Sequence, residues 1–215
     1  MSVTLSDLIA DLTENIPARN GVPSAAQYER AVKTAVMDFS RRCSREAITT
    51  LDIISGQASY DMPADFVSMI RLYLPFVIGD VMITPAGLVP LNGRSVDSQY
   101  KMTFANGKMT LTPTPTSSLS YYMSYASGWA LDEQSQYASM TEMEAAIVLI
   151  KAEAECLTLQ LNAEGGGVLA YRIGDESFDK SGGINAMIGQ RDMRLGAYKD
   201  ACASYNGFTA LYGGN

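Results

Sequence analysis

The sequence predicts an α+β fold in which helices from both ends of the chain form one helical bundle around a small inserted antiparallel β-domain. Apolar residues recur at helical spacing near both ends of the chain, whereas alternate residues are apolar in the middle. A hairpin signal, Asn106-Gly107, lies between two alternating segments. The expected parts are N-terminal helices of the bundle in 1–46, a β-rich insertion in 47–135, C-terminal helices in 136–207 and a tail in 208–215.

Two amphipathic helices are expected before the insertion. The first runs from Thr4 to Ile16, where apolar residues keep helical spacing. The second begins at Ser24, because Gln27 three residues later completes a capping-box pattern, and we expect it to run to about Glu46. Its apolar stripe contains Tyr28, Val32, Ala35, Val36, Phe39 and Cys43.

Basic side chains gather on the side of this second helix that lies opposite the apolar stripe. At about 100° per residue, four basic residues fall there together. Such a face can be solvated surface, can meet phosphate or can contact an acidic partner. The net charge of −7 argues against nucleic acid, and it leaves the solvated face and the acidic partner both open. The four residues are Arg30, Lys33, Arg41 and Arg45.

The middle of the chain is predicted to form a small, mainly antiparallel sheet. Residues 51–53 alternate with polar neighbours, and a turn at 55–57 followed by a proline-terminated segment at 60–63 predicts a local strand pair. The clearest signal is Asn106-Gly107, which demands a type I′ turn. Further strands are expected around 67–74, 100–104, 109–111 and 119–125.

Helices return after the insertion, over about 141–164 and 185–207. The apolar stripe of the first is wider than one face, which predicts burial on several sides. Gly189 and Gly196 lie inside the second, and each costs about 1 kcal/mol relative to alanine. That cost predicts another backbone packed very close to them.

The last residues carry aromatic side chains separated by glycines. Phe208, Leu211 and Tyr212 would fray in a monomer or be ordered in a partner's groove. The presence of large aromatic side chains in this segment favours binding in a partner's groove.

Several kinds of site are excluded by composition. The chain has no histidine, which removes Ser-His-Asp and Cys-His catalysis and histidine-containing zinc sites. Cys43, Cys156 and Cys202 are widely spaced, so buried free thiols in a reducing compartment are expected. No signal peptide and no stretch of about 18 uninterrupted apolar residues is present, so we expect a cytoplasmic protein with no cofactor, metal or membrane span.

Two other functions compete with a structural role. Carboxylates near one another could perform acid-base hydrolysis, although turns often hold such residues; they are Asp61, Asp65, Asp132 and Glu133. Aromatic side chains could stack on carbohydrate, although they are more often strand core; they are Tyr121, Tyr122 and Trp129.

Several segments, taken in order, resemble the head–tail adaptor (connector or neck) proteins of tailed bacteriophages. LDIISGQASYDMPADFV, at 51–67, follows a helix ending in FSRRCSRE, which is similar to that family's passage from its second helix into the inserted sheet. Further on come LTPTP, LSYYMSYASGWAL, a helix opening at Thr141 and RIGDESFD at 172–179, in the expected order. The loop at 76–97 has no pattern that aligns with the family.

The resemblance implies a structural virion protein, and no enzyme, that is assembled in the host cytoplasm and located at the head–tail interface. It implies a homo-oligomeric ring, usually a 12-mer, between the portal protein and a downstream neck or tail protein, with DNA passing through the lumen without specific binding. By position, Phe208, Leu211 and Tyr212 would bind the portal. Arg30, Lys33, Arg41 and Arg45 would make ring or partner contacts. The alternative is a phage-associated carbohydrate-binding or carboxylate-based hydrolase module.

Overall fold

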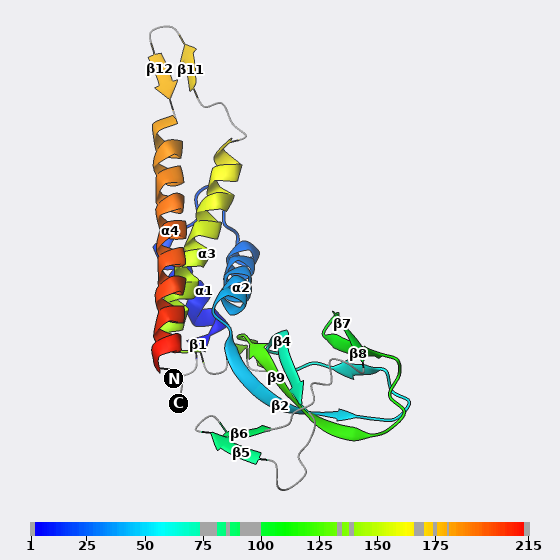
Figure 1. Cartoon of the computed structure of the whole chain (residues 1–215). Helices are drawn as coiled ribbons and strands as arrows, with labels where there is room; N and C mark the ends of the chain where they lie inside the picture. Colours follow the sequence, from blue (N-terminus) through cyan, green and yellow to red (C-terminus); the bar gives the residue numbers. More distant parts are fainter. Residues whose placement is uncertain are drawn as a thin grey trace. The chain divides into compact units, whose positions relative to one another are not determined.

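The computed structural model describes residues 3–73, 81–84, 87–90, 100–132, 135–137, 140–165, 170–173, 176–179 and 181–212. The chain divides into two compact units. The helical unit contains residues 1–42 and 129–207, and the β unit contains residues 43–128 with 208–215. The fold is therefore α+β, with a helical bundle formed from both ends of the chain and an inserted antiparallel β region, as the sequence predicts (Figure 1).

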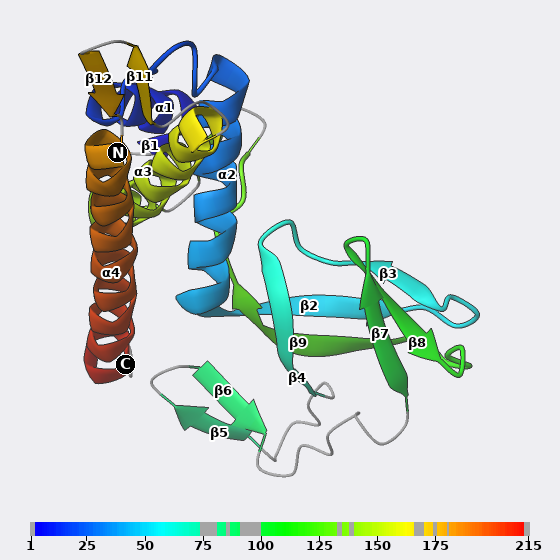
Figure 2. The ribbon, with the colours of Figure 1, turned by 90° about the horizontal axis from the view of Figure 1, so that it is seen from above.

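The helical unit is built on four helices in its described part. Figures 1 and 2 both place α3 between α2 and α4, and α1 packs against α2 and α3. Two short strands, β1 (Val3–Thr4) and β10 (Gln136–Tyr137), pair antiparallel beside them. The helices are α1 (Leu5–Asn15), α2 (Ala25–Arg42), α3 (Glu142–Gly165) and α4 (Ser181–Tyr212).

Two helices begin with a reciprocal capping pair. The Asp7 amide donates to Thr4 Oγ1 at 3.0 Å, and the Thr4 amide donates to Asp7 Oδ2 at 3.3 Å. The Thr141 amide donates to Glu144 Oε2 at 2.7 Å, and the Glu144 amide donates to Thr141 Oγ1 at 3.3 Å. These bonds satisfy amides that the first helical turn leaves without partners, which fixes where α1 and α3 start.

An aromatic cluster holds the core of the bundle together. Phe39 of α2 is completely buried, and its ring stacks on Trp129 at 4.6 Å between centroids and meets the ring of Tyr205 edge-on at 5.5 Å. The Trp129 amide donates to Ser40 Oγ at 3.0 Å. Residues from α2, α4 and the start of the 129–207 segment thus meet in one place.

Helix α3 is buried on several sides, which confirms the prediction from its wide apolar stripe. Val148, Ala154 and Cys156, which lie on different sides of the helix at about 100° per residue, are at most 1% exposed. Burial raises the pKa of the Cys156 thiol to about 12, and the nearby carboxylates of Glu155 and Glu153 add to the shift. All three cysteines are buried free thiols, as predicted: Cys43, Cys156 and Cys202.

The β unit contains two three-stranded antiparallel sheets (Figure 2). Side chains of both sheets form one core. The strand orders are β2-β9-β4 and β3-β8-β7, and a separate hairpin pairs β5 (Val81–Thr84) with β6 (Gly87–Pro90). The sheet strands are β2 (Arg45–Ile53), β3 (Ser59–Asp61), β4 (Phe66–Tyr73), β7 (Lys101–Ala105), β8 (Lys108–Thr112) and β9 (Leu119–Ser127). The shared core contains Leu51, Ile53, Tyr60, Leu72, Met109, Leu111, Tyr121, Met123 and Tyr125.

The hairpin predicted at Asn106-Gly107 is confirmed. Asn106 has φ of 52° and Gly107 has φ of 71°, the two positive values that a type I′ turn requires. The flanking residues Ala105 and Lys108 are paired, and the register continues along β7 and β8.

The local strand pair expected between 51–53 and 60–63 is wrong. Strand β2 pairs with β9 along its whole length, from Arg45 opposite Ser127 to Ile53 opposite Leu119, and β3 pairs with β8 instead. A nine-residue ladder satisfies many more backbone groups than a local hairpin with the three-residue β3 could.

Several helix boundaries also differ from the prediction. Helix α2 ends at Arg42 and not near Glu46, because from Arg45 onward the backbone bonds to β9. Helix α4 begins at Ser181 and continues past Gly207, since one glycine costs only about 1 kcal/mol and the following apolar residues keep helical spacing. Between the two helices expected in this part of the chain, β11 (Ala170–Ile173) and β12 (Glu176–Asp179) form a hairpin.

Candidate assembly surface

The basic residues predicted to lie together are divided between the two units. Arg30, Lys33 and Arg41 are exposed on the outer face of α2, as predicted. Arg45 is instead the first residue of β2 and pairs with Ser127, so it does not belong to this helix face. The correction follows from the early end of α2.

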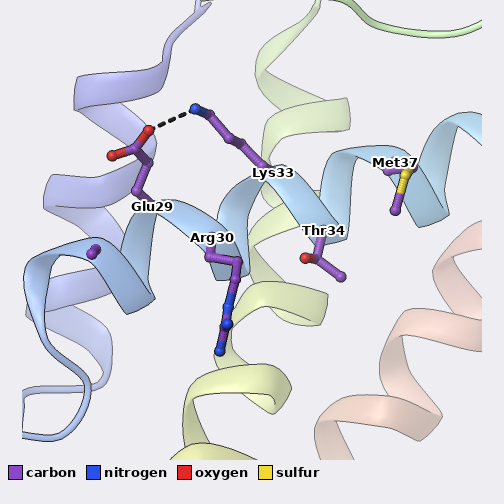
Figure 3. Close-up of a pocket in the computed structure, with 6 residues that line it drawn as sticks. Glu29, Arg30, Lys33, Thr34 and Met37 are labelled. Atoms are coloured by element: carbon purple, nitrogen blue, oxygen red, sulfur yellow. Dashed lines mark hydrogen bonds and ion pairs between the residues drawn. The ribbon is translucent and has the colours of Figure 1, made fainter. Parts of the chain in front are cut away.

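A shallow hollow of about 380 Å³ lies on the same face of α2 (Figure 3). Lys33 Nζ reaches Glu29 Oε1 at 2.6 Å, and Arg30 extends away from this pair. Arg30 makes no hydrogen bond or ion pair with any residue that the structure describes, and Met37 is half exposed. The hollow is lined by Ala26, Glu29, Arg30, Lys33, Thr34 and Met37.

The inner face of α4 holds this helix on the bundle. Arg194 Nε lies 2.9 Å from Glu153 Oε2, and Asn15 Nδ2 donates to Glu153 Oε1 at 2.9 Å. The Glu153 side chain is only 5% exposed. This carboxylate therefore joins α1, α3 and α4. Met187 is buried on the same face of α4.

A second polar contact links α4 to the end of α2. Arg42 Nε donates to Asp38 Oδ2 at 2.8 Å, and the Arg42 guanidinium lies 5.9 Å from the centre of the Tyr198 ring. Burial opposes charge on Asp38, but the hydrogen bond from Arg42, with the nearby Tyr198 hydroxyl, outweighs it and lowers the pKa of that carboxyl. Burial raises the pKa of the Tyr198 phenol, and the nearby Cys202 thiol and Asp38 carboxylate raise it further. These groups fix the direction of α4 along the bundle.

The outer face of α4 is lined by small side chains. A Cβ atom placed on Gly189 or Gly196 would meet nothing within 4 Å in the described part of the chain. The close backbone packing predicted at these glycines is therefore wrong within one copy, because both residues face outward and not toward α3. Met193, between them, is 64% exposed.

Replacing Gly196 by alanine is expected to stabilise the isolated chain by about 0.5–1 kcal/mol, because alanine has the higher helix propensity and its methyl group meets open space. Chemical denaturation followed by circular dichroism measures the change. Gly107→Ala is the matched control, since Gly107 has φ of 71° and the same substitution there should destabilise. A destabilised Gly196→Ala variant would contradict the open face.

The residues predicted to bind the portal lie at the end of α4. Phe208, Leu211 and Tyr212 fall on its last turns, and their side chains lie outside the described residues. Their spacing of three and four residues is the signal that predicts a continued helix there.

Three of the four carboxylates weighed as hydrolytic residues lie in separate contacts. Asp61 forms an ion pair with Lys108 at 3.0 Å, and Asp65 Oδ1 accepts from the Tyr125 hydroxyl at 3.1 Å. Asp132 Oδ1 accepts from the amide of Gln136 at 2.8 Å, which is a turn contact. Glu133 lies outside the described residues.

The three aromatic residues weighed as a carbohydrate platform do not form one. Tyr121 and Trp129 are buried, at 5% and 7% exposure, and only Tyr122 is substantially exposed. Tyr121 and Tyr122 belong to the β unit, whereas Trp129 belongs to the helical unit. Within the described ranges, no group of acidic or cysteine side chains is arranged to hold a metal ion, and no helix is long and apolar enough to cross a membrane.

The chain is similar to a family of known proteins and to solved structures. A family model described as SU10 adaptor protein matches residues 3–151, more than half of the chain. No curated protein matches. A solved structure described as "Neck of empty GTA particle computed with C6 symmetry" is similar at 13% identity, covering 83% of this chain and 87% of that chain, with a TM-score of 0.26.

Proposed function

Because the chain belongs to the SU10 adaptor protein family, matched over residues 3–151, we propose that it is a structural head–tail adaptor of a tailed bacteriophage. Copies of the chain form a ring below the portal protein, extend the DNA channel and dock the next neck or tail protein. The ring lies in the virion at the head–tail interface, is assembled in the host cytoplasm and contains about twelve copies. The family match is the observation that carries this proposal.

The charge of the chain supports a channel role. Each copy has a net charge of −7, so a ring of copies is strongly acidic. An acidic ring repels phosphate, which lets DNA pass through the lumen without specific binding. Basic residues on the outer surfaces, which include Arg30, Lys33, Arg41 and Arg45, then serve ring or partner contacts.

The helical unit and the β unit have different roles in this proposal. The helical unit forms the ring body, because its helices present long outer faces, and the β unit offers surface to the next protein. The end of α4 binds the portal through Phe208, Leu211 and Tyr212, which follow one another at helical spacing.

Mixing the purified chain with its portal protein tests the function. The chain alone should be largely monomeric in light scattering, because the portal sets the rotation between copies. With the portal, negative-stain microscopy should show a second ring attached to the portal ring. Purified particles that lack this chain between head and tail would contradict the proposal.

Truncation after Gly207 is expected to abolish binding to the portal while leaving the bundle folded. The last buried side chain described in α4 is Tyr205, so the bundle core is retained. Co-sedimentation with the portal measures binding, and circular dichroism measures folding. A Leu211→Ala/Tyr212→Ala variant keeps the helix length and should bind weakly, whereas Thr209→Ala, on another side of the helix, should bind normally. A truncated chain that still binds would assign portal contact to another segment.

A further inference from the structure

The outer face of α4 carries a row of small residues with a single large side chain in its centre. At about 100° per residue, Gly189, Met193 and Gly196 fall on the side opposite the buried Tyr198. Met193 is 64% exposed, and the glycines on either side leave open space. This face therefore presents one protrusion between two depressions.

The outer face of α2 has the opposite pattern. Arg30 and Met37 are both long and exposed, and the shorter Thr34 lies between them in the hollow (Figure 3). Arg30 extends into solvent, free of any hydrogen bond or ion pair with the described residues. This face therefore presents one depression between two protrusions.

The two patterns have the same spacing along the helix. Gly189 precedes Met193 by four residues, and Gly196 follows it by three. Arg30 precedes Thr34 by four residues, and Met37 follows it by three. When the helices lie parallel with Met193 opposite Thr34, each large side chain therefore meets a small one, which is how helix surfaces pack closely.

The same register also matches charges. Asp200 follows Met193 by seven residues, and Arg41 follows Thr34 by seven, so the two face each other. Asp200 makes no ion pair with a described residue, and the Arg41 guanidinium contacts only the sulfur of Met37, at 3.8 Å, among the described side chains. The α4 face thus offers a negative charge at Asp200, and the α2 face offers a positive charge at Arg41.

Within one copy, α2 and α4 run in the same direction. Arg19, just before α2, contacts Met187 near the start of α4, and Phe39 contacts Tyr205 farther along both helices. Rotation about an axis parallel to the helices preserves this direction, so neighbouring copies would meet in parallel. The faces lie on different helices of one unit, so the contact is heterologous, and such contacts form a ring when the rotation between copies closes.

We infer that the outer face of α4 in one copy binds the outer face of α2 in the next copy, with Met193 over Thr34 and Asp200 beside Arg41. This inference rests on the proposed ring and names the surfaces that build it. Gly189 and Gly196 each cost helix propensity, which implies a closely packed neighbour. In this arrangement that neighbour is another copy of the chain.

A bulky residue at Gly196 tests the shape match. Gly196→Met should leave the monomer folded, because the position is open, and should lower ring formation on the portal about tenfold or more. The matched control is Gly183→Met, since Gly183 is also open but lies about 140° around the helix from Gly196. The control should assemble like the wild type.

A charge exchange tests the register. Asp200→Arg should weaken assembly about fivefold, and the Asp200→Arg/Arg41→Asp double variant should recover to within about twofold of the wild type. In portal-bound rings, Thr34→Cys/Met193→Cys should give a ladder of covalently linked copies on oxidation, whereas Thr34→Cys alone should not. The three native cysteines are buried, so oxidation of the wild-type chain gives the background level of cross-linking.

The outcomes separate this inference from the function on which it rests. A wild-type chain that forms no ring with the portal contradicts the adaptor role, and the inference fails with it. A wild-type ring together with normal assembly of Gly196→Met, no recovery in the double variant and no cross-linked ladder overturns the inference alone. Reduced ring formation by Gly196→Met, together with restored assembly in the Asp200→Arg/Arg41→Asp double variant, supports the inference.

Discussion

Replacing Phe39 by alanine is expected to lower the free energy of unfolding of the chain by about 3–5 kcal/mol. The Phe39 ring is completely buried and contacts the rings of Trp129 and Tyr205, so its removal leaves a cavity where three segments meet. The loss is a large part of the ~5–15 kcal/mol that stabilises a typical domain. Urea denaturation followed by the fluorescence of Trp129, the single tryptophan of the chain, measures it.

Met193→Ala is the control for this variant. It removes a large apolar side chain that is 64% exposed, so stability should change by no more than about 0.5 kcal/mol. A Phe39→Ala variant that loses less than about 1 kcal/mol would mean that the cluster collapses around the cavity or does not form.

Arg194→Met is expected to destabilise the bundle by about 2–4 kcal/mol, since it removes the positive partner of a buried carboxylate. The Glu153 side chain is 5% exposed, and once Arg194 is gone it keeps only Asn15 as a hydrogen-bond partner among the described residues. Arg194 itself is 42% exposed, so water can replace part of the lost interaction and the effect stays below that of a fully buried pair. Thermal and chemical denaturation both measure the change.

Two further variants identify the cause of that loss. The Arg194→Met/Glu153→Gln double variant should recover most of the stability, because it removes the unpaired charge while its amide oxygen still accepts from Asn15. Lys33→Met breaks an ion pair whose partners are each about half exposed, so it should change stability by less than about 1 kcal/mol. Equal losses in Arg194→Met and the double variant would contradict the role of the buried charge.

Features decided by adjacent residues could be predicted from the sequence. The capping pairs Thr4–Asp7 and Thr141–Glu144 lie within one helical turn, and the turn at Asn106-Gly107 depends on two neighbouring backbone conformations. Burial on several sides of α3 followed from its apolar composition.

Features decided by distant residues could not be predicted in the same way. The partner of β2 is β9, which lies more than sixty residues farther along the chain, so no local pattern identifies it. The same pairing moved Arg45 from the expected helix into a strand. Helical propensity at the end of α2 was overridden by a ladder that forms only in the folded chain.

The assembly surface was predicted in part. Periodicity placed Arg30, Lys33 and Arg41 on one outer face of α2, because its apolar stripe is continuous. The orientation of α4 was harder to predict, since Arg194 interrupts its buried face and pairs with Glu153. Without that orientation, the sequence could not say whether the close backbone neighbour predicted at Gly189 and Gly196 lies inside the chain, and in the structure both glycines face outward.

The hydrogen bond between the Trp129 amide and Ser40 means that the polypeptide leaves the bundle and returns to it at neighbouring points. Residues 43–128 are therefore inserted between these two neighbouring points of the helical unit. Such a module can lengthen, shorten or be exchanged during evolution while the helices keep their own packing.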